Sequence, residues 1–121
     1  MEEQFRQLIE LLLPEGILTY FELVNTIKDH EGLKIYLEEK NIIPEEFKGQ
    51  LLHSKGFYPQ ISIQDFPIRG QEVQLCIKRR RWEIQDTKEI VSRDWQLVQS
   101  GTRITKEFAA FLKGILGQST H

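Results

Sequence analysis

The sequence has few of the residues that build disulfides, metal sites and membrane spans. Its 121 residues include one cysteine, Cys76, so an internal disulfide and a zinc site made of several thiolates are both excluded. The three histidines are scattered, without the i, i+4 spacing of a helical metal-binding pair. No apolar run approaches the roughly 18 residues that a membrane helix needs. We therefore expect a soluble protein that binds no metal and no cofactor.

Signals for secretion and for catalysis are also scarce. The N-terminus starts with Glu2 and Glu3 and has no basic region, so we expect a cytoplasmic protein without a secretory signal. No glycine-rich phosphate loop is present. A nucleophile would have to be Cys76 or Ser54, and although His53 adjoins Ser54, no third group is placed to orient that histidine. We expect that the chain is not an enzyme.

What the chain does contain is typical of one globular domain, which we expect to span residues 1–121. Hydrophobic residues make up 40% and charged residues 28%, and there is no internal repeat. Residues 1–49 hold 5 Lys/Arg and 11 Asp/Glu, a net charge of −6, whereas residues 50–121 hold 11 and 7, a net charge of +4. This asymmetry predicts a polyanion-binding face in the C-terminal part, with a chance distribution of solvated charges as the alternative.

The hydrophobic periodicity predicts an α+β fold. Apolar residues recur with helical spacing over about residues 2–13 and 105–116, which predicts an N-terminal and a C-terminal helix. Between them, apolar and polar residues alternate, which predicts a hairpin over about 20–39 and three further strands over about 58–97. Because the turns between neighbouring strands are short, we expect an antiparallel sheet of about five strands.

Each predicted helix carries an apolar stripe, and we expect both stripes to pack on the domain's own sheet. Exposure of either stripe would instead favour association with a second copy of the chain, giving a homodimer, or with another subunit. The stripe residues are Phe5, Leu8, Ile9 and Leu12 in the first helix, and Phe108, Phe111 and Leu112 in the second.

The densest positive charge lies within the stretch CIKRRRWEI, residues 76–84, where four cations interrupt a strand pattern. Cations on both faces suit a ribbon in solvent, since a buried unpaired arginine costs several kcal/mol, so we expect residues 78–95 to form a basic hairpin that projects beyond the sheet. Such a ribbon fits the major groove of double-stranded DNA, and arginine contacts guanine or phosphate in bidentate fashion. The predicted nucleic-acid-binding residues are Lys78, Arg79, Arg80, Arg81 and Trp82, with Arg93, Arg103 and Lys106 as flanking phosphate contacts.

Two other interpretations of this hairpin stay open. Trp82 and Trp95 either stack on bases or on arginines, or pack together across the hairpin, and packing is favoured. The arginines either contact nucleic acid or form ion pairs with acidic residues of the same hairpin, as side chains on exposed strands commonly do. These acidic residues are Glu83, Asp86, Glu89 and Asp94.

Short motifs follow one another in a distinctive order from residue 53 to residue 82. They are His53-Ser54, Asp65-Phe66-Pro67, Gly70, Val73-Gln74-Leu75, Lys78–Arg81 and Trp82. This order resembles the N-terminal module of a large group of bacterial insertion-sequence transposases. The phrases EEKNIIPEEFKG, SKGFYPQISIQDFPIRG and SRDWQLVQSGTRITKEFAAFLK are similar to a subgroup in which a short reading frame encodes only this N-terminal region. The resemblance covers about residues 11–116.

The chain departs from the larger group at the zinc site. In that group, cysteines after the basic run and an upstream cysteine pair form a zinc-binding knuckle. This chain has Glu83–Lys88 and Pro44–Phe47 at those places, so the resemblance implies no metal here. In full transposases a nuclease domain with a metal-binding carboxylate triad follows the module. We see no such domain after Leu116 and expect the chain to bind DNA without cutting it.

The resemblance implies a function in transposition. We expect a DNA-binding module that recognises the ends of an insertion element through the basic hairpin. The alternative is a protein-interaction module that docks on a separately encoded catalytic transposase subunit, through the acidic N-terminal half or the C-terminal helix. Loss of DNA affinity on Arg79→Ala with Arg81→Ala favours the first, whereas sensitivity to substitution of Phe108 or Phe111 favours the second.

Overall fold

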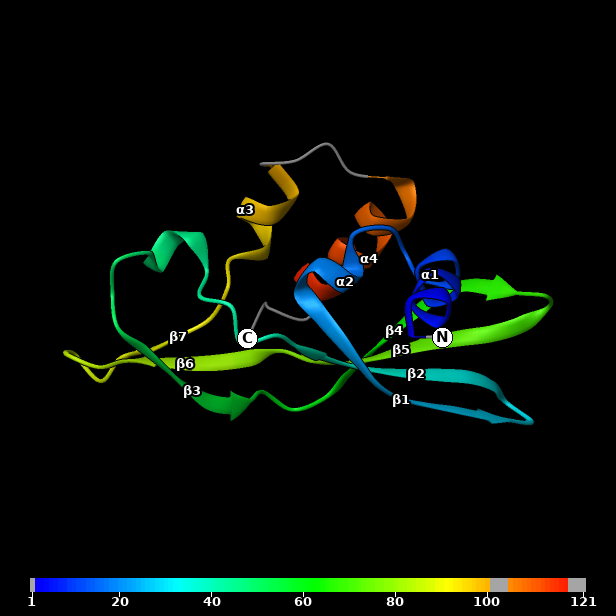
Figure 1. The fold of residues 1–121 in the computed structure, drawn as a ribbon, viewed down its shortest axis with the longest axis horizontal. Coiled ribbons are helices and arrows are strands. Elements are labelled where there is room, and N and C mark those ends of the chain that lie inside the picture. The colour runs from blue at the N-terminus through cyan, green and yellow to red at the C-terminus, as the bar shows by residue number, and fades with distance from the viewer. Residues whose placement is uncertain (1, 101–104, 118–121) are drawn as a thin grey trace.

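The computed structural model describes residues 2–100 and 105–117 and confirms the α+β class (Figure 1). Helices lie near the two ends of the chain and strands between them. The helices are α1 (Glu2–Leu12), α2 (Ile17–Tyr20), α3 (Trp95–Ser100) and α4 (Lys106–Leu116), with a 3-10 turn η1 (Glu45–Phe47). The strands are β1 (Phe21–Asp29), β2 (Gly32–Glu39), β3 (Leu52–Phe57), β4 (Ile61–Ile68), β5 (Gln71–Lys78), β6 (Arg80–Ile84) and β7 (Ile90–Val91).

The strands form two sheets in place of the single antiparallel sheet that the sequence predicts. One sheet has the order β1-β2-β5-β4 and the other the order β3-β6-β7. The first sheet is mixed, because β2 and β5 run parallel, from Leu33 opposite Val73 to Glu38 opposite Lys78. The prediction of a purely antiparallel sheet is therefore wrong. Strands β3 and β4 lie between β2 and β5 in the chain, and a connection of that length allows parallel pairing.

Two antiparallel hairpins of the first sheet follow from local sequence. Strands β1 and β2 confirm the hairpin predicted over about 20–39, and their register shifts between Leu23 and Asn25, where Asn25 breaks the apolar alternation. Strands β4 and β5 are joined by a two-residue turn in which Arg69 and Gly70 have φ angles of 53° and 76°. Two left-handed residues match the twist of the flanking strands, and glycine adopts this conformation without strain.

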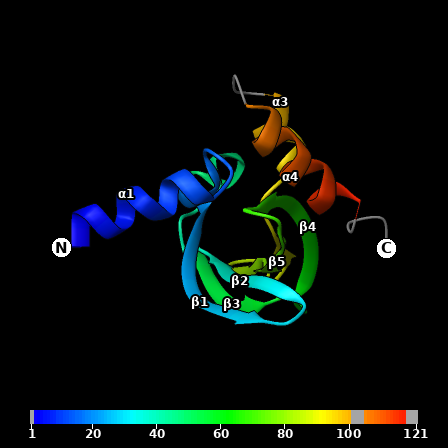
Figure 2. The ribbon, with the colours of Figure 1, turned by 90° about the vertical axis from the view of Figure 1, so that its right-hand side faces the viewer.

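The first sheet curls into a trough, and α4 packs over its concave side (Figure 2). Burying each large apolar side chain here contributes roughly 1.5–3 kcal/mol. Helix α4 begins at its cap, where the Thr105 hydroxyl accepts a hydrogen bond of 3.1 Å from the N–H of Phe108. The predicted C-terminal helix and its packing on the domain's own sheet are confirmed. The shared core includes Ile35, Leu37, Val73, Leu75 and Ile77 from the sheet, and Phe108, Phe111, Leu112 and Ile115 from α4.

Helix α1 lies where the sequence predicts a helix, but its apolar stripe does not pack on the sheet as predicted. It projects away from the trough, and no residue within it is buried (Figure 2). The exposed fractions of Phe5, Leu8 and Leu12 are 59%, 52% and 40%. Only Leu13, just beyond the helix, is buried in the core, although Ile9 packs partly against it. The prediction that this stripe packs on the sheet is wrong for most of its length.

Of the three strands predicted over about 58–97, the last is mostly replaced by a helix. Strand β7 covers only Ile90 and Val91, and helix α3 starts at Trp95. An Asp94 side-chain oxygen accepts hydrogen bonds from the N–H groups of Gln96, at 2.9 Å, and Leu97, at 3.4 Å. This is the geometry of a helix N-cap, for which aspartate is a preferred residue. The sequence therefore contained the signal for a helix start at Asp94.

Two elements have little sequence signal of their own. Strand β3 is rich in polar residues and contains Gly56, so it reads as a connection, and it forms because β6 supplies its hydrogen-bonding partners. The short helix α2 follows Gly16, whose φ of 98° turns the chain after α1. Across residues 2–100 and 105–117, no helix is long and apolar enough to cross a membrane.

Candidate nucleic-acid interface

The basic run lies where one long strand path passes from the first sheet into the second. Strand β5 ends at Lys78, β6 begins at Arg80, and Arg79 joins them. Along β5 the residues buried on the concave side are Val73, Leu75 and Ile77, which are odd-numbered, whereas in β6 the buried residues are Trp82 and Ile84. The buried face of the strand thus changes within the basic run, and all four cations are half-buried.

The predicted hairpin of residues 78–95 is only partly present. Strands β6 and β7 do pair antiparallel, through Trp82 opposite Val91 and Glu83 opposite Ile90. They are not an isolated two-stranded ribbon, because β3 pairs with the other edge of β6. Trp95 lies in α3, where its ring stacks on Phe21 with centroids 5.4 Å apart, so it does not pair with Trp82 across a hairpin.

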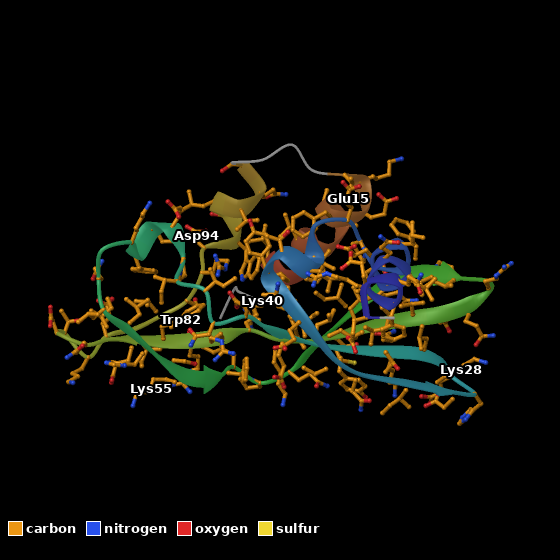
Figure 3. The ribbon with its side chains drawn as sticks, viewed as in Figure 1. Glu15, Lys28, Lys40, Lys55, Trp82 and Asp94 are labelled. Carbon is orange, nitrogen blue, oxygen red and sulfur yellow. The ribbon has the colours of Figure 1, made fainter. Side chains whose placement is uncertain are left out.

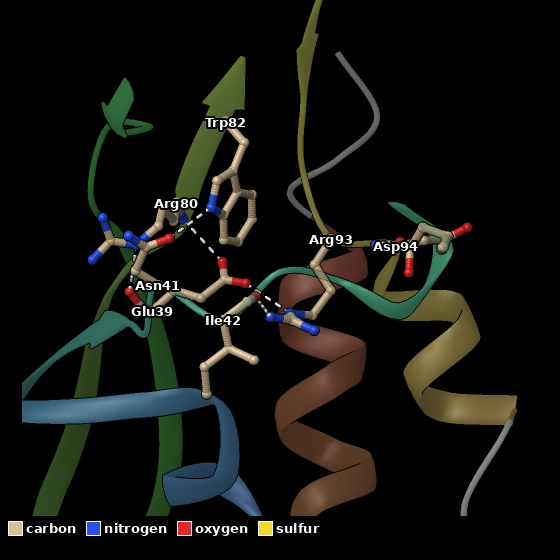
Figure 4. Close-up of polar contacts among 8 residues, drawn as sticks. Glu39, Asn41, Ile42, Arg80, Trp82, Arg93 and Asp94 are labelled. Carbon is tan, nitrogen blue, oxygen red and sulfur yellow. Dashed lines mark hydrogen bonds and ion pairs between the residues drawn. The ribbon is translucent and has the colours of Figure 1, made fainter. Parts of the chain in front are cut away.

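Trp82 is buried completely and cannot stack on a base. Its exposed fraction is 0%, and its indole Nε1 donates a 2.9 Å hydrogen bond to the Asn41 side-chain oxygen (Figure 4). A buried tryptophan usually satisfies its N–H group in this way. The two tryptophans therefore do not pack together across a hairpin, and Trp82 instead packs inside the fold, with the Arg93 guanidinium 5.9 Å from its ring centroid. Trp82 therefore lies outside the candidate interface.

Arg80 and Arg93 surround one buried carboxylate, Glu39 (Figure 4). The backbone N–H of Arg80 donates to Glu39 Oε1 at 2.9 Å, and the Arg93 Nε donates to Glu39 Oε2 at 2.8 Å. The Arg80 side chain also donates to the Glu39 carbonyl, at 3.0 Å, and to the Ser54 hydroxyl. Arg93 donates a further 2.8 Å bond to the Ile42 carbonyl.

This buried cluster is structural. The Arg93 guanidinium also lies between aromatic rings, 5.1 Å from the centroid of Tyr20 and 5.7 Å from that of Trp95. The exposed fraction of Arg93 is 9%, so its prediction as a phosphate contact is wrong: its charge is already used inside the protein. Burial raises the pKa of Glu39, while the Arg80 N–H and the Arg93 guanidinium act in the opposite direction.

Arg79 and Arg81 have different surroundings from Arg80. Both guanidinium groups lie against the ring of Tyr58, at 5.4 Å and 5.7 Å from its centroid. The Tyr58 N–H donates a 2.8 Å hydrogen bond to the Arg79 carbonyl, which fixes the ring beside the two arginines. The Nε atoms of both arginines are buried and have no hydrogen-bond partner among the residues that the structure describes. Two partly desolvated cations thus share one aromatic platform.

The predicted ion pairs of the hairpin do not form at these arginines. Within the part of the chain that the structure describes, neither Arg79 nor Arg81 lies within ion-pair distance of a carboxylate. Glu83 pairs instead with Lys55 of β3, at 3.7 Å. Figure 3 shows Lys55 on the side of the second sheet opposite to Trp82. Lys55 therefore lies on the face of this sheet that points away from the buried tryptophan.

The other predicted contacts lie elsewhere. Lys78 is beside Glu38 of β2, and adjacent residues of an extended strand point to opposite faces, so it points away from Arg79. Lys106 is at the start of α4, roughly 15 Å along the helix from Leu116, given a rise of about 1.5 Å per residue. Arg79 and Leu116 line one cavity, so Lys106 lies at the opposite end of α4 from Arg79. Arg103 is outside the described residues.

Sequence reasoning missed Tyr58 and Lys55. The pattern placed Tyr58 at the start of a strand without a role, because its contact with the arginines depends on the pairing of β3 with β6. The signal available in the sequence was an aromatic pair, Phe57 and Tyr58, in an otherwise polar segment. Each ring contacts an arginine: Tyr58 contacts Arg79 and Arg81, and the Phe57 ring centroid lies 4.6 Å from the Arg80 guanidinium.

Cys76 is buried, and burial raises the pKa of its thiol, as expected for an inert cysteine. Among the described residues, no group of three or more His, Cys, Asp or Glu side chains could hold a metal ion.

Comparison of the chain with protein-family models, with curated proteins and with solved structures finds no match.

Proposed function

We propose that the chain binds nucleic acid through an arginine–tyrosine surface, which we define as Lys55, Tyr58, Arg79 and Arg81. The observation that carries the proposal is the pair of guanidinium groups on Tyr58 without a carboxylate partner among the described residues. A half-buried arginine has lost part of its hydration, so it gains by pairing with an anion from outside. Phosphate is the anion that the planar guanidinium fork fits best.

The motif order supports a role in transposition. We propose that the chain is the non-catalytic N-terminal module of an insertion-sequence transposase, that its partner is double-stranded DNA, and that it acts in the cytoplasm. Recognition of the element ends is part of this proposal. A selection from a random DNA pool tests it, and enrichment of one sequence is the expected result.

The binding surface is tested by the fluorescence anisotropy of a labelled random-sequence duplex. We expect Arg79→Ala with Arg81→Ala to weaken binding about 100-fold or more, because two charged contacts are lost and each is worth roughly 1.5–3 kcal/mol. The matched control is Lys28→Ala with Lys34→Ala, which removes two charges from the hairpin at the other end of the molecule (Figure 3). Equal affinities for the wild type and both variants would contradict the proposal.

A second candidate function is docking on another protein, and helix α1 favours it. Its stripe of Phe5, Leu8 and Leu12 is exposed, and an isolated helix of 11 residues is marginal in water. A catalytic transposase subunit that covers this stripe would stabilise the helix. Helix α4 does not offer such a surface, because Phe108 and Phe111 are buried in the core.

Co-purification with a separately expressed catalytic subunit tests this candidate. We expect Leu8→Glu to abolish the association, while Gln7→Glu on the opposite face of α1 leaves it intact. Retention of the subunit by the Leu8→Glu variant excludes α1 as the docking element.

A further inference from the structure

A polar cavity adjoins the arginine–tyrosine surface. It has a volume of about 440 Å³ and lies between the end of β3, the segment after β7 and the last turn of α4. Tyr58 and Arg79 belong both to its lining and to the surface, so the two sites are continuous. The other residues that the argument uses are Ser92, Trp95 and Gln96.

The cavity has hydrogen-bonding groups that the fold leaves available. Arg79 Nε is buried and has no hydrogen-bond partner within residues 2–100 and 105–117. No hydrogen bond from the Ser92 hydroxyl or the Gln96 side-chain amide to another described residue occurs. Asp94, in contrast, uses its side chain to cap α3. A ligand here would meet the Arg79 cation, a hydroxyl and an amide, which together can donate and accept, and the Asp94 carboxylate is also in the lining.

The size and the walls of the cavity limit what can enter. Small-molecule sites have volumes of roughly 300–1,000 Å³, and this cavity lies near the lower limit. Leu116 is half-buried and gives the cavity apolar lining that a ligand can reach, whereas Trp95 and Ile115 are buried. A flat polar ring with a negatively charged group therefore fits the chemistry, with the ring against the apolar wall and the charge at Arg79.

We infer that this cavity accepts one unpaired nucleotide of a DNA strand that is bound on the arginine–tyrosine surface. The inference rests on the proposed function, because Arg81 and Lys55 hold the neighbouring phosphates. Arg79 contacts the phosphate of the unpaired nucleotide, and its base enters the cavity and meets Ser92 and Gln96. Proteins that read an extrahelical base combine such hydrogen bonds with contacts to aromatic or apolar side chains.

The test compares two labelled duplexes, one fully paired and one with a single bulged 2-aminopurine nucleotide. We expect the wild type to bind the bulged duplex about tenfold more tightly, within the range of energies for stacking one base. The fluorescence of the 2-aminopurine should also change on binding. The Ser92→Phe variant, which fills the cavity, should lose this preference and retain the affinity for the paired duplex.

Two further variants serve as a control and as a replacement for Ser92→Phe. Ser62→Phe is the matched control, because Ser62 is exposed on β4 and lies outside the cavity lining, and it should keep the preference. If Ser92→Phe does not fold, as judged by thermal unfolding, Gln96→Ala replaces it, and part of the preference should be lost.

Each alternative outcome has a distinct meaning. Equal wild-type affinity for the two duplexes overturns the inference while the proposed function stands. Absence of binding to both duplexes at low salt overturns the proposed function itself. Binding of free deoxyadenosine monophosphate, lost in Ser92→Phe, without preference for the bulged duplex would assign the cavity to a free nucleotide and contradict the inference.

Discussion

Arg79, Arg80 and Arg81 are identical neighbours whose surroundings give them different roles. Arg80 donates to Glu39 and Ser54 and is part of the folded framework. Arg79 and Arg81 lie on Tyr58 and have no carboxylate partner within the described chain. Side chains point alternately to opposite faces of a strand, so residues 79 and 81 face one side and residue 80 the other. This difference in direction explains why the three arginines have different partners.

At this scale the buried Glu39–Arg93 pair gives the clearest stability prediction. Arg93→Met should lower the free energy of unfolding by about 3–5 kcal/mol, because the buried Glu39 charge loses its main partner. Urea unfolding measures this change. The control is Lys48→Met, which breaks an exposed pair with Glu45 and should cost about 0–1 kcal/mol. Similar small effects in both variants would show that Arg93 is not structural.

Asp65 gives a prediction on pH. Burial, together with nearby Glu107, raises its pKa from the ordinary value of 3.8, against a hydrogen bond from the Phe66 N–H. A carboxyl with a raised folded-state pKa destabilises the fold as pH increases through that pKa. Asp65→Asn should therefore raise the melting temperature at pH 7, and this gain should disappear near pH 3. A gain that is equal at both pH values would rule out the ionisation of Asp65 as its cause.

At the scale of elements, local signals predicted some parts and long-range pairing decided the others. The alternation of Leu33, Ile35 and Leu37 was sufficient for β2, and the stripe of α4 was sufficient for that helix. No local pattern could show that β5 lies parallel to β2, because that contact joins segments about forty residues apart. Strand β3 likewise depends on β6, and with it the position of Tyr58 on the arginines.

The packing of α4 on β4 is tested at Gly114. A Cβ atom at this position would lie 2.8 Å from a side-chain carbon of Ile63, which is buried. We expect Gly114→Ala to destabilise the protein by roughly 1–2 kcal/mol, although alanine favours helix by about 1 kcal/mol. The matched control is Gly117→Ala, where φ is −65° and the nearest contact is 3.4 Å, so stability should be unchanged or slightly higher. Thermal unfolding of the two variants decides.

At the scale of the whole molecule, the charge asymmetry has a structural counterpart. The acidic N-terminal half forms α1 and the β1–β2 hairpin, whereas the second sheet carries the basic run. The sequence predicted a basic surface in the second part of the chain, but it could not show which cations are exposed. Arg80, Trp82 and Arg93 are used internally, and burial of this kind depends on contacts with Glu39 and Asn41, far away in the chain.

The most direct test of the central claim is the salt dependence of binding to a random-sequence DNA duplex. Each phosphate neutralised by a cation contributes about −0.9 to the slope of log K against log salt. Three cations, Lys55, Arg79 and Arg81, predict a slope of about −3, which should fall to about −1 on Arg79→Ala with Arg81→Ala. A wild-type slope between about 0 and −1 would contradict the account, because the arginine–tyrosine surface would then not be the face that meets DNA.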